Sequence, residues 1–222
     1  CNTIGACRDV ADFESAGEWA ERASDFCDTN SMNALPGMCR VNHAEVMKFK
    51  GRLAEAQELA DRASAELSVW APRIAGAAFY ELGEVRLRLG ELAQAEQAFR
   101  EADELGRTPE PGLSVLRLVQ GNAKGALASI RRAVGNDSLG LPARARLLPA
   151  AVDIAVAAGE PDEAATYAEQ LSGIADTFDS SALRAGSAYA RGQVALARGE
   201  ADTAYHEFRQ ARMTWDSPGA TY

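Results

Sequence analysis

The sequence lacks the features that most catalytic sites need. It contains only two histidines, His43 and His206, which lie in widely separated parts of the chain, and histidine is the side chain that most often activates a nucleophile. It has no G-x-x-x-x-G-K-[ST] loop, no G-x-G-x-x-G after a strand and no H-E-x-x-H. We therefore expect no enzymatic activity and no cofactor.

Cysteine is also scarce, and all four residues fall in the first fifth of the chain, at Cys1, Cys7, Cys27 and Cys39. A small secreted scaffold would distribute its cysteines through the domain, so we interpret these as reduced, partly buried side chains of a cytosolic protein. A zinc site is an alternative, because Cys39 and His43 are four residues apart on a predicted helix. The spacing matches no C-x-x-C pair, and we expect no metal.

Long apolar runs are absent as well. No stretch approaches the roughly 20 residues that cross a bilayer, and no basic segment precedes an apolar one as in a signal peptide. The net charge is −9, from 32 acidic and 23 basic residues, which repels polyphosphates. These features favour a cytoplasmic protein whose segment contacts neither membrane nor nucleic acid. Because the chain begins at Cys1, we interpret it as a fragment of a longer protein.

What the sequence does contain is a helical composition and a repeat. Alanine, leucine, glutamate and arginine dominate, and aromatic residues make up 7%. A glycine followed five residues later by an alanine recurs, as in GELAQA from Gly90 to Ala95. The anchor positions are 11 (a degenerate copy at Ala11), 51, 90, 121, 159 and 199, spaced by 31 to 40 residues.

Each copy predicts a helix, a tight turn and a second helix. Apolar and small residues follow the anchor at helical spacing, as in Ala95, Phe99 and Ala102. The anchor glycine suits the left-handed residue that ends a helix. Acidic residues suit the start of the next helix, where backbone N–H groups lack partners. These residues are Asp12, Asp162, Glu200 and Asp202.

Small residues inside the helices predict where paired helices approach closely. Gly83 and its counterpart Gly192 each cost about 1 kcal/mol of helix propensity, which close packing must recover. Between two anchors, Pro109 and Pro111 leave room for a short helix from about 112 to 119. We interpret Trp19, Trp70 and Trp215 as packing anchors, and the many glutamates as a solvated helix face.

The pattern resembles the tetratricopeptide repeat, in which W-x-x-L-G-x-x-Y precedes A-x-x-x-F-x-x-A and a proline. The best copy runs through Phe79, Leu82, Gly83, Ala95, Phe99, Ala102 and Pro109. The resemblance implies an all-α helix-turn-helix repeat solenoid of about six helix pairs in a right-handed superhelix. We expect one domain over 1–222, with repeats at 1–34, 35–69, 70–108, 109–138, 139–178 and 179–216.

In such arrays the first helices of successive repeats line a concave face that binds an extended peptide or a helix. We expect partner-binding residues at the inward positions of these helices. These are Asn42, Glu45, Phe49, Tyr80, Glu84, Arg88, Arg146, Asp153, Tyr189 and Gln193. A homo-oligomer stays open as an alternative. A second hypothesis is a small-molecule sensor with its pocket near Pro109 to Leu118, where the short helix would leave a cavity.

Three stretches together resemble the C-terminal tetratricopeptide region of large bacterial LuxR-type regulators. They are CNTIGACRDVADFESAGEWAERASDFC, AFYELGEVRLRLGELAQAEQAFREADELGRTPEPGLSVLRLVQG, and FRQARMTW followed by SPGATY. In that family an ATPase module precedes the repeats and a helix-turn-helix DNA-binding domain often lies at a chain end. Neither is present in this chain, so the resemblance implies the regulatory, protein-binding segment of a transcription regulator.

Overall fold

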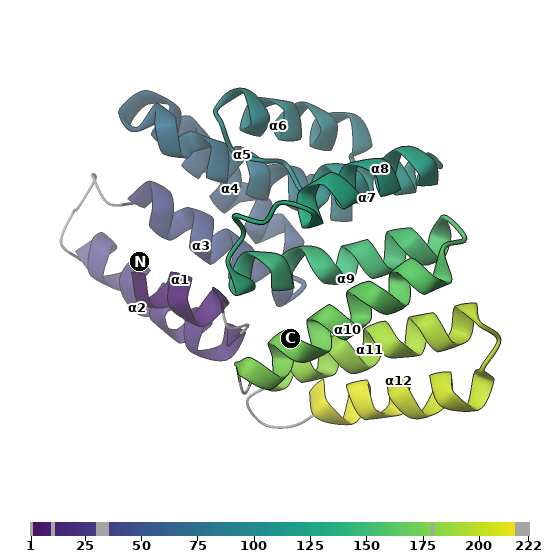
Figure 1. Cartoon of the computed structure of the whole chain (residues 1–222). Coiled ribbons are helices and arrows are strands. Elements are labelled where there is room, and N and C mark those ends of the chain that lie inside the picture. Colours follow the sequence, from purple (N-terminus) through teal and green to yellow (C-terminus); the bar gives the residue numbers. More distant parts are fainter. Residues whose placement is uncertain (1, 10–11, 30–35, 179, 216–222) are drawn as a thin grey trace. The chain divides into compact units, whose positions relative to one another are not determined.

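The computed structural model describes residues 2–9, 12–29, 36–178 and 180–215, and this part of the chain is all helical (Figure 1). The all-α prediction is therefore confirmed, while the degenerate anchor Ala11 lies outside the described residues. The helices are α1 Asn2–Asp9, α2 Phe13–Thr29, α3 Pro36–Phe49, α4 Leu53–Trp70, α5 Pro72–Arg88, α6 Leu92–Glu104, α7 Gly112–Val119, α8 Ala123–Val134, α9 Leu141–Ala157, α10 Pro161–Thr177, α11 Ser181–Ala197 and α12 Ala201–Trp215.

Each predicted anchor glycine ends the first helix of a pair in the left-handed conformation. The φ values are 73° at Gly51, 78° at Gly90, 83° at Gly121, 80° at Gly159 and 77° at Gly199. The next amide donates back across the turn, as when Glu91 N–H donates to the carbonyl of Arg86 at 2.9 Å. Glycine is required here because a Cβ would strain this backbone region. Gly106 adopts the same conformation after α6, although the repeat pattern does not single it out.

The helix starts match the sequence prediction only in part. Asp162 and Asp202 lie in the first turns of α10 and α12, where a carboxylate favours the positive end of the helix. Side-chain caps are made elsewhere, by Asn122 at α8 and Ser180 at α11. Asp162 therefore acts through its charge, because α10 has no side-chain cap hydrogen bond.

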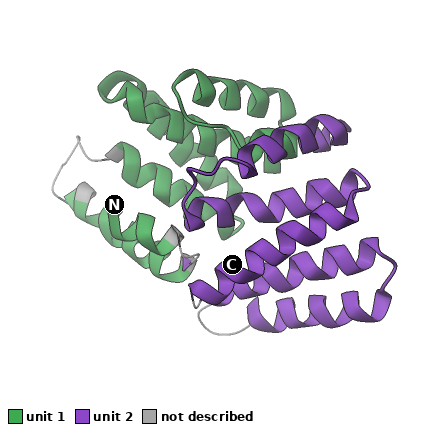
Figure 2. Ribbon diagram, in the orientation of Figure 1, with its two compact units in different colours: residues 1–8, 13–116, 222 green, residues 9–12, 117–221 purple. Residues whose placement is uncertain are grey.

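The chain divides into two compact units, with residues 13–116 forming the body of unit 1 and residues 117–221 that of unit 2 (Figure 2). In unit 1 each helix from α2 to α6 packs against the next one. The same holds in unit 2 from α8 to α12. First helices of neighbouring pairs also pack together, α3 on α5 and α9 on α11. This is the helix-pair packing that defines the tetratricopeptide-like class.

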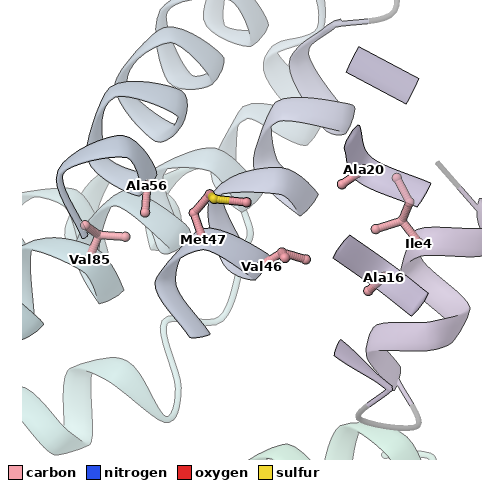
Figure 3. Packing of buried hydrophobic residues seen from close by; sticks show 7 residues of the cluster. All are labelled: Ile4, Ala16, Ala20, Val46, Met47, Ala56 and Val85. Carbon is pink, nitrogen blue, oxygen red and sulfur yellow. The ribbon is translucent and has the colours of Figure 1, made fainter. Parts of the chain in front are cut away.

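The core of unit 1 is built from small side chains and a few large ones. One cluster joins residues of five helices, and Figure 3 shows these side chains close together. They are Ile4, Ala16, Ala20, Val46, Met47, Ala56 and Val85. The alanines bring the helix backbones close together, so Met47 and Val46 fill the space that remains. None of the helices in the described residues is both long and apolar enough to span a membrane.

Gly83 and Gly192 lie where paired helices approach closely, as predicted, and the structure shows that a ring of the second helix packs against each. A Cβ at Gly83 would lie 2.6 Å from two atoms of the Phe99 ring, and a Cβ at Gly192 would lie 2.6 Å from the Phe208 ring. Both distances are shorter than any real carbon contact. The Phe99 ring also lies against Gly112 of α7, where a Cβ would be 2.5 Å away. Phe99 therefore sits between two glycines and is completely buried.

The prediction for the tryptophans is wrong for Trp70. Its side chain is 84% exposed at the end of α4, because the helix stops there and Pro72 turns the chain into α5. Trp19 is 45% exposed and lies under the guanidinium of Arg22. Trp215 does pack, with its ring 6.0 Å from that of Tyr189. The central helix α7 has the predicted short length of 8 residues.

Candidate functional site

In unit 1 most of the predicted partner-binding residues are buried. Asn42 and Glu45 on α3, and Tyr80 and Glu84 on α5, each expose less than a tenth of their surface. Phe49 is partly buried. Arg88 at the end of α5 is the exposed member of the set. Four of the six predicted residues of unit 1 are therefore interior residues that offer little surface to a partner.

The buried residues surround a lysine that the sequence analysis missed. Lys48 Nζ on α3 lies 2.7 Å from Oε1 of Glu81 and 3.6 Å from Oε2 of Glu84, both on α5. Arg88 approaches the second carboxylate, with Nη1 2.6 Å from Glu84 Oε2. We call Glu45, Lys48, Glu81, Glu84 and Arg88 the Lys48 cluster. The interpretation of the glutamates as a solvated face is therefore wrong for Glu45, Glu81 and Glu84.

Two further groups complete this arrangement, Tyr80 of α5 and Arg107 after α6. The hydroxyl of Tyr80 donates to Oε1 of Glu84 at 3.1 Å. The guanidinium of Arg107 lies over the Tyr80 ring, 5.1 Å from its centroid. Glu84 thus accepts a hydrogen bond from the Tyr80 hydroxyl and forms ion pairs with Lys48 and Arg88. These partners compensate the cost of burying its negative charge.

The two carboxyl groups beside Lys48 have opposite pKa shifts. Burial raises the pKa of Glu81 to about 7, with Lys48 opposing and Glu45 adding to the rise. Burial also acts to raise the pKa of Glu84, but the charges of Lys48 and Arg88 outweigh it, so the net shift is downward. Three carboxyl groups face two cations in the cluster, and Glu81 is the one that is insufficiently compensated.

Replacing Glu81 with glutamine is expected to change how stability depends on pH. The pKa of Glu81 in the folded state, about 7, lies above the ordinary 4.5. Protonated Glu81 therefore contributes fully to the free energy of unfolding below pH 4.5, and this contribution is lost as the pH rises through 7. Glu81→Gln should therefore be more stable than the wild type at pH 8, by about 1–2 kcal/mol. The difference should shrink toward pH 5. Urea denaturation at both pH values measures it, and an equal difference at pH 5 and 8 would contradict the assignment.

In unit 2 the predicted residues form a partly accessible face instead. Gln193 on α11 donates through Nε2 to Oδ1 of Asp153 on α9, at 3.3 Å. Burial raises the pKa of Asp153, and the Gln193 hydrogen bond opposes the rise. Tyr189 stands one turn before Gln193 and is 39% exposed. Arg146 lies two turns before Asp153 on α9 and is partly buried. We call these four residues the α9–α11 face.

The ring of Tyr189 packs against two aromatic rings of α12. Its ring centroid lies 5.5 Å from that of Phe208 and 6.0 Å from that of Trp215, both tilted. Burial, followed by the charge of Asp153, raises the pKa of Tyr189. A tyrosine supported in this way has a fixed orientation while part of its ring stays in water, which suits contact with another molecule.

Three positions in the region proposed for a small-molecule pocket are closely packed. Gly112 contacts Phe99 and Glu84, since a Cβ there would lie 2.6 Å from Oε1 of Glu84. Ser114 and Leu116 are completely buried. The Phe99 ring therefore fills the space beside Gly112 and packs in one cluster with Leu116.

The cysteines differ from the sequence prediction at one position. Cys39 is disulfide-bonded, whereas Cys7 keeps its thiol. Reduced cysteine is thus wrong for Cys39, whose sulfur is not available as a thiolate ligand in the alternative zinc site. Among the described residues, histidine, cysteine, aspartate and glutamate form no group of three or more that could hold a metal ion. Cys1 and the side chain of Cys27 lie outside the described residues.

No protein-family model and no curated protein matches this sequence. Solved structures are similar to it, among them two tetratricopeptide-repeat proteins. The tetratricopeptide-repeat protein YrrB, described as having an unusual peptide-binding site, is 20% identical with a TM-score of 0.43, over 90% of this chain and 96% of that one. A tetratricopeptide-repeat protein from Parabacteroides merdae is 16% identical with a TM-score of 0.45, over 98% of this chain and 92% of that one.

Proposed function

We propose that the chain is a non-catalytic scaffold that binds a protein or peptide, and that the α9–α11 face of unit 2 is the docking surface. The observation that carries this proposal is Tyr189, which is exposed over 39% of its surface yet fixed by two aromatic rings. Tyrosine and tryptophan dominate the binding energy of protein interfaces because they bury a large rigid area. The neighbouring Asp153 and Gln193 supply an acceptor and a donor for a peptide backbone.

A second part of the proposal concerns the larger protein to which this chain belongs. We propose that it is the regulatory repeat segment of a bacterial transcription regulator of the LuxR type, acting in the cytoplasm. The sequence stretches described above support this, and the sequence of the complete gene would test it. An ATP-binding loop before the repeats and a helix-turn-helix domain are expected there. A gene product without either would contradict the setting but leave the scaffold proposal intact.

A peptide selection followed by calorimetry tests the docking surface. Peptides of about 12 residues selected from a random display library on the whole chain should lose affinity about tenfold or more for Tyr189→Ala. Tyr205→Ala is the matched control, because Tyr205 is 63% exposed on α12 and outside the α9–α11 face. Equal affinity of the selected peptides for the wild type and Tyr189→Ala would refute this docking surface, and so would a selection that enriches no peptide.

A further inference from the structure

The α9–α11 face contains a carboxylate that has no cation beside it. Asp153 is partly buried, and its Oδ1 accepts a hydrogen bond from Nε2 of Gln193 at 3.3 Å. Within the described part of the chain, no arginine, lysine or histidine forms an ion pair with Asp153. Burial raises the pKa of Asp153, and the Gln193 hydrogen bond opposes this rise without help from a positive charge.

Two other partly buried carboxylates of unit 2 each have an arginine partner. Glu207 on α12 forms a two-point ion pair with Arg191, in which Nε lies 3.0 Å and Nη2 2.9 Å from its oxygens. Glu163 on α10 pairs with Arg131 of α8. A cation from another molecule would therefore give Asp153 the compensation that arginines of the chain give to Glu163 and Glu207.

The ring of Tyr189 offers a second attraction for a cation on the same face. Tyr189 stands one turn before Gln193 on α11, and its ring is fixed by Phe208 and Trp215. Burial and then the charge of Asp153 raise the pKa of Tyr189, so the carboxylate acts electrostatically on the phenol. Ammonium and guanidinium groups bind the face of an aromatic ring, and a nearby carboxylate adds to that attraction.

Space for a bound segment is present beside Tyr189. Gly186 lies three residues before Tyr189 on α11, so both belong to one face of the helix. A Cβ at Gly186 would meet no described atom within 4 Å, whereas the Phe208 ring fills the corresponding place at Gly192. Gly186 therefore makes no packing contact that requires a glycine among the described residues, and it leaves room for a partner to approach α11.

We propose that the α9–α11 face binds a basic segment of a partner protein, and that one lysine or arginine of this segment places its charge between the Asp153 carboxylate and the Tyr189 ring. This inference rests on the proposed scaffold function and names the chemistry of its partner. The net charge of −9 acts in the same direction, because it attracts positively charged segments over long range. Arg146, the remaining member of the face, lies two turns before Asp153, about 10 Å along the axis of α9. The cation of the partner is therefore expected at the Asp153 end.

Selection of peptides from a random display library on the whole chain, followed by calorimetry, tests this inference. The enriched peptides are expected to contain lysine or arginine more often than the library does. Replacing their basic residues with glutamine, one at a time, should identify a position at which binding weakens about tenfold. Asp153→Asn should weaken the unchanged peptide about tenfold but the glutamine version less than about twofold, because both substitutions remove the same ion pair.

Two further variants make the result specific. Asp137→Asn changes the net charge equally, but Asp137 is exposed between α8 and α9, so binding should change less than about twofold. Gly186→Gln should weaken the peptides about tenfold, because its side chain occupies the open space beside Tyr189. The melting temperature of Gly186→Gln should not fall, since glutamine is a better helix former than glycine. Circular dichroism confirms that the variants are folded.

Several outcomes would overturn the inference. One is equal binding of the basic peptides and their glutamine versions, and another is an equal loss in Asp153→Asn and Asp137→Asn. If the enriched peptides depend on Tyr189 but carry no excess of lysine or arginine, the scaffold function stands and the basic partner is wrong. If no peptide is enriched, or if Tyr189→Ala binds the peptides as the wild type does, the docking surface itself is wrong and this inference falls with it.

Discussion

Replacing Lys48 with methionine is expected to lower the free energy of unfolding by about 3–5 kcal/mol at pH 8. Lys48 is the buried cation shared by Glu81 and Glu84, at 2.7 and 3.6 Å. Methionine has a similar length but no charge, so Glu81 would lose its nearest cation and Glu84 would keep only Arg88. They would then have to bind protons or remain buried as unpaired charges, and either response costs stability. At pH 5 the loss should be smaller, because proton uptake is easier there.

Two further variants make the Lys48 prediction specific. Lys50→Met removes a lysine whose side chain is 40% exposed and whose Nζ lies 3.6 Å from Glu21, so it should cost less than about 1 kcal/mol. The double variant Lys48→Met with Glu81→Gln should be more stable than Lys48→Met alone, because one of the uncompensated carboxylates is gone. Urea denaturation measures all three. A Lys48→Met loss as small as that of Lys50→Met would show that the cluster is not an ionic core.

Replacing Phe99 with alanine is expected to cost about 3–5 kcal/mol, near the upper part of the range for a buried aromatic ring. The cost of such a substitution depends on how far the surroundings can collapse into the cavity. Here Gly83 and Gly112 line the ring, and they have no side chains that could move inward. Ala95 and Ala102 belong to the same core cluster and are equally unable to fill the space. The cavity should therefore stay open.

Trp70→Ala is the control for this prediction, because it removes a larger ring that is 84% exposed. Its expected cost is within about 0.5 kcal/mol. Thermal and urea denaturation should agree on the order of the two variants. If Phe99→Ala and Trp70→Ala are equally stable, the ring does not act as the filler between α5, α6 and α7.

The sequence predicted the features that local backbone geometry and helix crossing impose. The anchor glycines such as Gly90 adopt a φ of 78°, which most residues with a Cβ reach only with strain. Gly83 was predicted to lie where paired helices approach closely, and the structure adds that the ring of Phe99 occupies this place. The anchor glycine recurs in five copies and the crossing glycine in two, and this repetition makes both visible in a single sequence.

The residues that the sequence placed wrongly depend on neighbours that are distant in the chain. Glu81 and Glu84 look like ordinary helix-surface residues, and only the approach of α3 brings Lys48 between them. One local signal existed, since Lys48 stands between the apolar residues Met47 and Phe49 of a helix. Trp70 was misplaced for a related reason, because a tryptophan at a helix end is buried only if another element covers that end.

The position of the Phe99 ring also limits how this array can be rebuilt. The ring belongs to α6 but rests on Gly83 of its own pair and on Gly112 of the following one. The α5–α6 pair is thus incomplete on its own, since one of the two glycines that contact the Phe99 ring, Gly112, belongs to the next pair along the chain. Anyone who deletes, duplicates or grafts that pair must carry both glycines with it.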